Sequence, residues 1–98
     1  MADPQQPDAR FFERSNAYIK LANEQCDAAQ RGEVTASMMF ASARYNIFVA
    51  AVSFRTQAEL AAQKQEIVDY YAQQYRAMLE EHVADYISNF SSYIQPPA

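Results

Sequence analysis

Residues that interrupt helices are almost absent from the interior of this 98-residue chain. Its one glycine is Gly32, and its four prolines stand at positions 4, 7, 96 and 97, so residues 33–95 contain neither type. A turn-rich β fold needs such residues at its chain reversals, and a chain that is 50% apolar and 20% charged has the composition of a folded domain. We therefore predict one all-α domain over 9–95, an antiparallel three-helix arrangement with a long C-terminal helix. Residues 1–8 are expected to be a disordered lead-in and 96–98 a frayed end.

The first helix is predicted over about residues 9–31. Apolar and small side chains recur there at steps of three and four and cover one arc of the helix. Asp8 is the expected N-cap. Gly32 is expected to end the helix in the left-handed conformation, which glycine adopts without strain.

The second helix is predicted over about residues 36–54, with Thr35 as its N-cap. Its apolar side chains point in nearly every direction, and Arg44 is its only charged residue. A helix that is apolar all round is buried all round. Since two neighbouring helices cannot cover it completely, this pattern favours a partner chain. Arg44 also argues against a membrane span, because an arginine at the centre of a span costs about 2.5–3.5 kcal/mol.

Thr56 and Glu59 form a capping-box pattern that starts the third helix, which is predicted over 57–93. At 1.5 Å per residue this helix reaches roughly 55 Å, against about 35 and 28 Å for the first two. An apolar stripe continues along its C-terminal part, and its residues recur at spacings of eleven, which keep a stripe nearly straight. Either the helix breaks near Ser88 and Asn89 and folds back, or a second chain covers it. We expect the second chain.

Charge is distributed unevenly along the chain. Residues 1–56 carry six acidic and six basic side chains, whereas 57–98 carry six acidic and two basic ones, with no base after Arg76. Nucleic acids and anionic membrane surfaces attract basic patches, so we expect neither as a partner. A cluster of acids near the C-terminal end is interpreted as a solvated face, or alternatively as a docking surface for a basic partner: Glu80, Glu81 and Asp85.

No metal, cofactor or catalytic set can be assembled from the sequence. His82 is the only histidine and Cys26 the only cysteine, too few for a zinc, iron–sulfur or di-iron site. Acidic rather than basic residues flank Cys26, so we expect a buried structural thiol. His82 is interpreted as an inert interface histidine, or alternatively as a pH-sensitive contact. An enzyme is therefore not the expected function, and no cofactor is expected.

Three segments carry a family resemblance: FFERSNAYIKLANEQCDAAQRGEV, ASARYNIFVAA and YYAQQYRAMLEEHVADYI. They resemble a family of small bacterial proteins known only as a domain of unknown function. The resemblance extends over about residues 10–90, nearly the whole chain. It implies a bacterial, cytoplasmic, all-helical protein, and it implies no activity, cofactor or partner.

The chain is predicted to be a non-enzymatic interaction or structural protein that forms a homodimer. Self-association is expected through the second helix and the C-terminal half of the third, at the following residues: Phe48, Val52, Tyr86, Ile87, Phe90, Tyr93 and Ile94. The alternative is a protein that binds a small anionic ligand, because Arg44 and Asn46 are the strongly polar residues of an otherwise apolar helix. Its site is expected to combine these residues: Arg44, Asn46, Tyr45, Tyr71 and Tyr75.

Overall fold

The computed structural model describes residues 7–95, and every regular element in that range is an α-helix. The predicted all-α class is confirmed. The chain divides into two compact units, one that ends at Phe54 and one that begins at Arg55. Most of the predicted lead-in and the whole frayed end lie outside the described residues, at 1–6 and 96–98.

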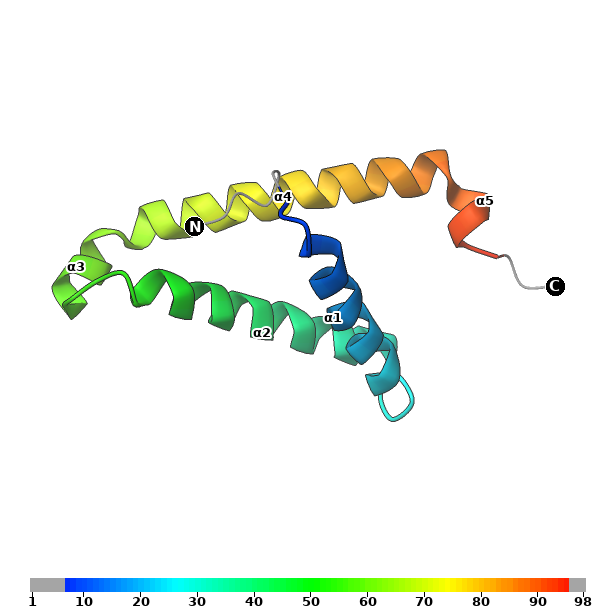
Figure 1. Ribbon diagram of the computed structural model, residues 1–98, viewed down its shortest axis with the longest axis horizontal. Coiled ribbons are helices and arrows are strands. Elements are labelled where there is room, and N and C mark those ends of the chain that lie inside the picture. The colour runs from blue at the N-terminus through cyan, green and yellow to red at the C-terminus, as the bar shows by residue number, and fades with distance from the viewer. Residues whose placement is uncertain (1–6, 96–98) are drawn as a thin grey trace. The chain divides into compact units, whose positions relative to one another are not determined.

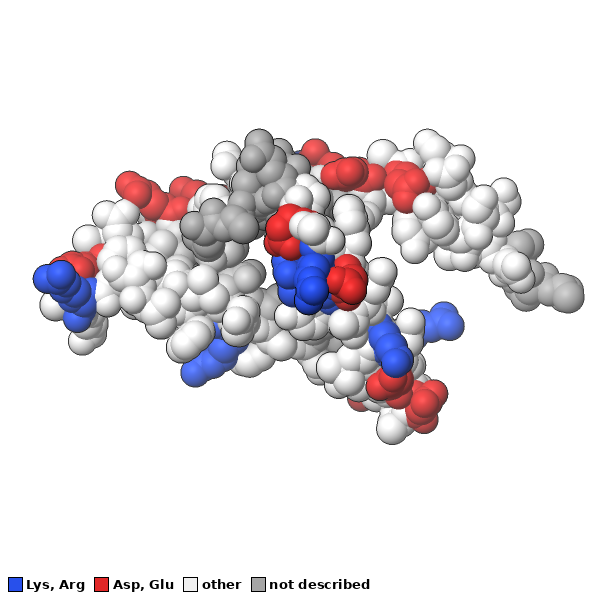
Figure 2. Space-filling model, viewed as in Figure 1, with Lys and Arg blue, Asp and Glu red and all other residues white. Residues whose placement is uncertain are grey.

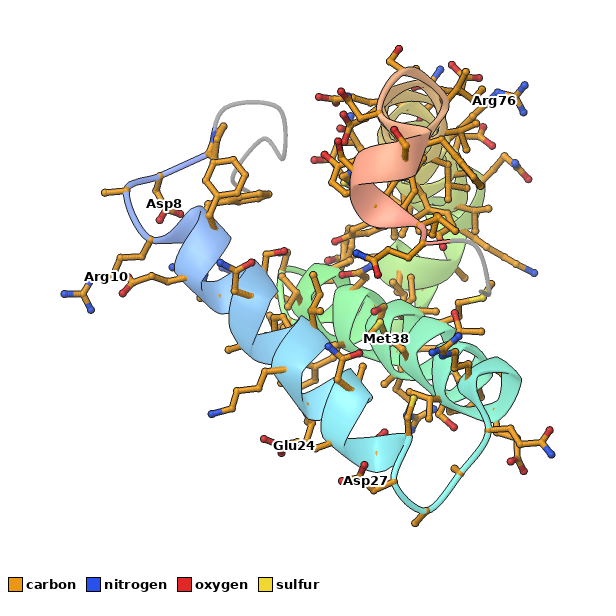
Figure 3. All side chains as sticks on the ribbon, turned by 90° about the vertical axis from the view of Figure 1, so that its right-hand side faces the viewer. Asp8, Arg10, Glu24, Asp27, Met38 and Arg76 are labelled. Carbon is orange, nitrogen blue, oxygen red and sulfur yellow. The ribbon has the colours of Figure 1, made fainter. Side chains whose placement is uncertain are left out.

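The first unit is a pair of helices, α1 at Phe11–Gln25 and α2 at Arg31–Ala51, joined by a short connection (Figure 1). Arg10, not Asp8, occupies the N-cap position of α1, which corrects the predicted cap. Asp8 still contacts this end of the helix. Its carboxylate accepts hydrogen bonds from the Arg10 N–H at 2.9 Å and from the Arg14 guanidinium at 2.6 Å. Figure 3 shows Asp8 and Arg10 beside the first turn of α1.

The connection between α1 and α2 lies earlier in the chain than the sequence predicts. Gln30 is the N-cap of α2, and its backbone N–H donates to Glu33 Oε1 at 2.9 Å. Gly32 therefore lies in the first turn of α2, and none of the residues described by the structure has a positive φ. Thr35 lies inside α2 and caps nothing. Both predictions were wrong because Glu33 reaches back to Gln30 and starts the helix before either residue.

The second unit contains α3 at Gln57–Ala62, α4 at Lys64–Ser88 and α5 at Phe90–Tyr93. The predicted continuous third helix is therefore interrupted twice, at Gln63 and at Asn89. The second interruption is the break that the sequence left open as an alternative to a continuous helix. Figure 1 shows α5 turning away from the axis of α4.

The start of α3 confirms the predicted cap. Thr56 Oγ1 accepts a hydrogen bond from the Glu59 N–H at 3.2 Å. Glu59 Oε2 in turn accepts a hydrogen bond from the Arg55 N–H at 3.1 Å, one residue before the cap. The first bond satisfies a backbone donor that a helix start otherwise leaves unpaired, and the second joins the Glu59 side chain to the residue before the cap.

Little apolar surface is buried in the described part of the chain. Its buried hydrophobic side chains are Val34 and Ala50, both in α2, with 6% and 8% of their surface exposed. Most other side chains of α2 are exposed. The all-round burial that the sequence predicts for α2 is therefore not supplied by α1, its neighbour in the first unit.

Candidate protein-interaction surface

One face of α4 exposes a line of apolar side chains, which we name the α4 stripe: Val68, Tyr75, Leu79, Val83 and Tyr86. At 3.6 residues per turn these positions fall within an arc of roughly 80°. Their exposed fractions lie between 46% and 56%. Because α3 has six residues and α5 has four, neither can cover the 25 residues of α4. The stripe is therefore uncovered within its own unit.

At the C-terminal end of α4 the stripe continues into an open groove, which we name the corner groove because it forms where α5 turns away. Its lining is apolar apart from one histidine and consists of Leu79, His82, Val83, Tyr86, Ile87, Phe90 and Ile94. In Figure 2 acidic side chains gather along α4, whereas the surface at the α4–α5 corner is uncharged on the face in view. Such a surface suits apolar side chains of a partner.

Asp85 fixes the geometry of this corner. Its Oδ1 accepts a hydrogen bond from Asn89 Nδ2, and its Oδ2 accepts one from the Tyr93 hydroxyl, both at 2.9 Å. The backbone N–H of Asn89 donates to the Asp85 carbonyl oxygen, also at 2.9 Å. The ring of Tyr93 packs on that of Tyr86, with centroids 4.5 Å apart. We name the contacts among Asp85, Asn89 and Tyr93 the Asp85 latch.

The latch also changes the acidity of Tyr93. The hydrogen bond to Asp85, and then the negative charge of Asp85, raise the pKa of the Tyr93 hydroxyl above its ordinary value of 10.0. An ionised Tyr93 would bring a second negative charge next to the carboxylate. The latch therefore requires a protonated tyrosine.

The break itself follows from the local sequence. Asp85, Asn89 and Tyr93 are spaced four residues apart, about one helical turn each, so their side chains start on the same side of the chain. Asn89 Nδ2 also donates to the Asp85 carbonyl oxygen at 3.2 Å, and such local bonds compete with helix continuation. Sequence reasoning missed the roles of Asp85 and Asn89, although their four-residue spacing was a usable signal.

The residues predicted at an interface are exposed in both units. In the first unit Phe48 and Val52 keep 60% and 66% of their surface. The predicted residues of the second unit gather at the α4–α5 corner: Tyr86, Ile87, Phe90, Tyr93 and Ile94. All of these except Tyr93, which belongs to the latch, line the corner groove. The interface itself stays a prediction.

The residues predicted to bind an anion are divided between the two units. Arg44 and Tyr45 are exposed on α2, and Asn46 is half-buried beside them. Tyr71 is half-buried and Tyr75 exposed on α4. Burial, and then the neighbouring Tyr70, raise the pKa of the Tyr71 hydroxyl. The anion-binding pocket stays a prediction. It was argued from an Arg44 side chain on a buried helix, whereas Arg44 is exposed.

Across residues 7–95, no cluster of three or more His, Cys, Asp or Glu side chains is arranged to hold a metal ion. Over the same span, no helix has both the length and the apolar character to cross a membrane. Cys26 is half-buried at the C-cap of α1, and His82 is an exposed side chain of the corner groove.

Comparison with known proteins identifies the family of this chain. Residues 11–87 match a family described as a protein of unknown function, DUF3144. The chain belongs to this family. This confirms the resemblance found in the sequence, and the family carries no assigned function.

A solved structure supports the same assignment. The NMR structure of the protein NB7890A from Shewanella sp is 44% identical in sequence, covers 89% of this chain and 93% of that chain, and superposes with a TM-score of 0.74. None of the curated proteins compared matches the chain. Function must therefore be argued from the surface described above.

Proposed function

We propose that this chain is a non-enzymatic interaction protein that assembles as a homodimer through the α4 stripe and the corner groove, with α2 completing the interface. The α4 stripe carries this proposal, because five large apolar side chains lie nearly half exposed on one helix face. Single exposed apolar side chains are ordinary on protein surfaces, whereas a contiguous set is typical of an interaction site.

The lengths of the helices support a second chain as the partner that covers α4. At 1.5 Å per residue α2, with 21 residues, spans about 31 Å, whereas α4, with 25 residues, spans about 38 Å. Both α1 and α2 are therefore shorter than α4. A second copy of this chain is the cover that we propose for the last turns of α4.

Burial energies indicate how extensive the interface has to be. Completing the burial of one half-exposed Leu, Val or Tyr side chain contributes about 1 kcal/mol. Ten such side chains in a symmetric pair contribute on the order of 10 kcal/mol, against an association cost of about 4–15 kcal/mol. The α4 stripe alone therefore gives a weak dimer. For this reason we include the exposed side chains Phe48 and Val52 of the first unit.

Two observations support the setting we propose, the cytoplasm of a bacterium. A single cysteine cannot form an intramolecular disulfide, which suits a reducing compartment. The solved relative comes from Shewanella sp. Neither observation depends on the interface.

A charge placed in the α4 stripe tests the proposal. Leu79→Asp is expected to convert the dimer to a monomer in light scattering after gel filtration, because an unpaired carboxylate is costly in an apolar interface. Gln73→Asp introduces the same charge on α4 about 120° away and is expected to leave the dimer intact. A helical Leu79→Asp protein with the mass of the wild type would contradict the proposal.

A further inference from the structure

The break between α4 and α5 occurs without a helix-breaking residue. Residues 64–95 contain neither glycine nor proline, and Asn89, where the helix is interrupted, has a φ of −126° and a ψ of 32°. The apolar spacing also continues across the break. Counted along an uninterrupted helix, Leu79, Phe90 and Ile94 would fall within an arc of roughly 60°. Such a pattern is typical of one continuous helix, so the bend rests on the contacts that form across it.

Two of these contacts require the bend. In a continuous helix Tyr93 would lie about 12 Å beyond Asp85 along the axis, and the Asp85 side chain would lean toward the helix N-terminus, away from Tyr93. The 2.9 Å bond from the Tyr93 hydroxyl to Asp85 Oδ2 could not form there. The rings of Tyr86 and Tyr93, whose centroids are 4.5 Å apart, would start from positions about 10 Å apart. The contact between Asp85 and Asn89 spans four residues and suits either form.

The contacts that favour the bend are exposed to solvent. The bonds from Asn89 and Tyr93 to Asp85 lie at the surface, and 48% of Tyr93 is exposed. Because water competes for such bonds, each adds only modest net stability. A continuous helix would regain the regular main-chain bonds that the break interrupts, but the asparagine at 89 and the serines at 91 and 92 are only moderate helix formers. The two forms are therefore close in free energy, and one hydroxyl group can determine which form is populated.

We propose that α5 is a two-position segment: the Tyr93 hydroxyl holds it in the bent position, and residues 89–94 extend α4 as one helix when this hydroxyl leaves Asp85. In the bent position Phe90 and Ile94 line the corner groove. In the extended position the same two side chains continue the α4 stripe, and the groove loses the wall that they form. The segment thus converts one apolar surface from a groove into a straight stripe. Both positions belong to a single chain, so neither requires the proposed self-association.

NMR spectroscopy of the isotopically labelled full chain tests the two positions. In the wild type we expect a non-helical Cα chemical shift at Asn89 and nuclear Overhauser effects between the rings of Tyr86 and Tyr93. Tyr93→Phe keeps the ring and removes the hydroxyl. It is expected to move the Asn89 shift into the helical range and to abolish the contacts between the two rings. Tyr86→Phe is the matched control, because it removes a hydroxyl from the other ring, leaves the bonds to Asp85 in place and should keep the wild-type shifts.

The other outcomes overturn the proposal. An Asn89 shift that is the same in Tyr93→Phe and in the wild type would show that the hydroxyl does not hold the bend. Random-coil shifts over 89–93 in Tyr93→Phe would show that α5 comes loose without extending α4. A helical shift at Asn89 in the wild type would show that the bent form is not populated. Asp85→Ala removes the acceptor instead of the donor and should also make Asn89 helical, so a bent Asp85→Ala protein contradicts the role of this bond.

Discussion

At the scale of single residues, Asp85 has the clearest structural role in the second unit. Both of its carboxylate oxygens accept hydrogen bonds, one from Asn89 and one from Tyr93, and these residues lie on the far side of the break. Glu80 and Glu81 belong to the same acidic cluster but lie on α4 without such contacts to α5. The position of one carboxylate therefore determines the shape of the corner groove.

Replacing Asp85 is expected to change the titration of Tyr93. Asp85→Ala should lower the Tyr93 pKa toward its ordinary value, because Asp85 supplies the two largest causes of the raised pKa. A raised folded-state pKa means that the latch stabilises the fold below about pH 10 and that this contribution is lost as the pH rises through the Tyr93 pKa. Tyrosinate absorbance measures the titration, and Tyr93→Phe identifies the signal.

Glu81→Ala is the matched control for this experiment, because it removes an acid of the same cluster that does not contact α5. Its Tyr93 titration is expected to resemble that of the wild type. A Tyr93 titration that is the same in Asp85→Ala and in the wild type would show that the latch is absent in solution.

Asp8 is expected to make the start of α1 sensitive to acid. The hydrogen bond from Arg14, and then the one from the Arg10 N–H, hold the pKa of the Asp8 carboxyl below its ordinary value of 3.8. A lowered folded-state pKa means that the stabilisation is present above about pH 4 and is lost as the pH falls through the Asp8 pKa. Asp8→Asn should loosen the first turn of α1 at neutral pH, as measured by amide hydrogen exchange. Equal protection in both proteins at neutral pH would refute this role.

At the scale of helices, the stability of a Gly32→Ala variant distinguishes the two positions considered for Gly32. The residue either lies in the first turn of α2 or ends α1 in the left-handed conformation. Its φ is not positive, and nothing lies within 4 Å of a Cβ added at this position. Gly32→Ala is therefore expected to stabilise the fold by about 0.4–1 kcal/mol, by reducing the freedom of the unfolded chain. A glycine that ended α1 in the left-handed conformation would give a loss instead. Urea unfolding measures the difference.

The caps of α2 and α3 can be compared with a pair of threonine variants. Thr56→Ala is expected to destabilise the fold by about 0.5–2 kcal/mol, because the Glu59 N–H loses its acceptor. Thr35→Ala is the control, since Thr35 lies inside α2, where alanine is the better helix former. Unfolding curves that show equal losses for both variants would be incompatible with the helix starts described here.

The sequence predicted some of the local features correctly and missed others: the Asp8 cap, the Thr35 cap and the helix end at Gly32 were wrong. The helical class and the Thr56 cap follow from residues close together in sequence. The break at Gln63 has no glycine or proline to mark it. The break at Asn89 was one of two alternatives that the sequence left open, whereas the hydrogen bonds of the Asp85 latch were not predicted. At the candidate interaction surface, spacing predicted the apolar residues at the end of α4. It did not predict that the Asp85 carboxylate contacts Asn89 and Tyr93.

At the scale of the whole molecule, two helical units each expose apolar surface that their own helices do not cover. In the first unit α1 leaves most of α2 exposed, and in the second unit α3 and α5 are too short to cover α4. Membership of a family of unknown function adds no activity to this picture. Self-association is therefore the property that we propose for the whole molecule.

The solution mass of the wild-type chain at several concentrations tests self-association most directly. Sedimentation equilibrium is expected to give a mass near twice the chain mass of 11.2 kDa. The fraction of dimer should rise with concentration, as mass action requires. A mass of 11.2 kDa at every concentration would contradict the proposed dimer.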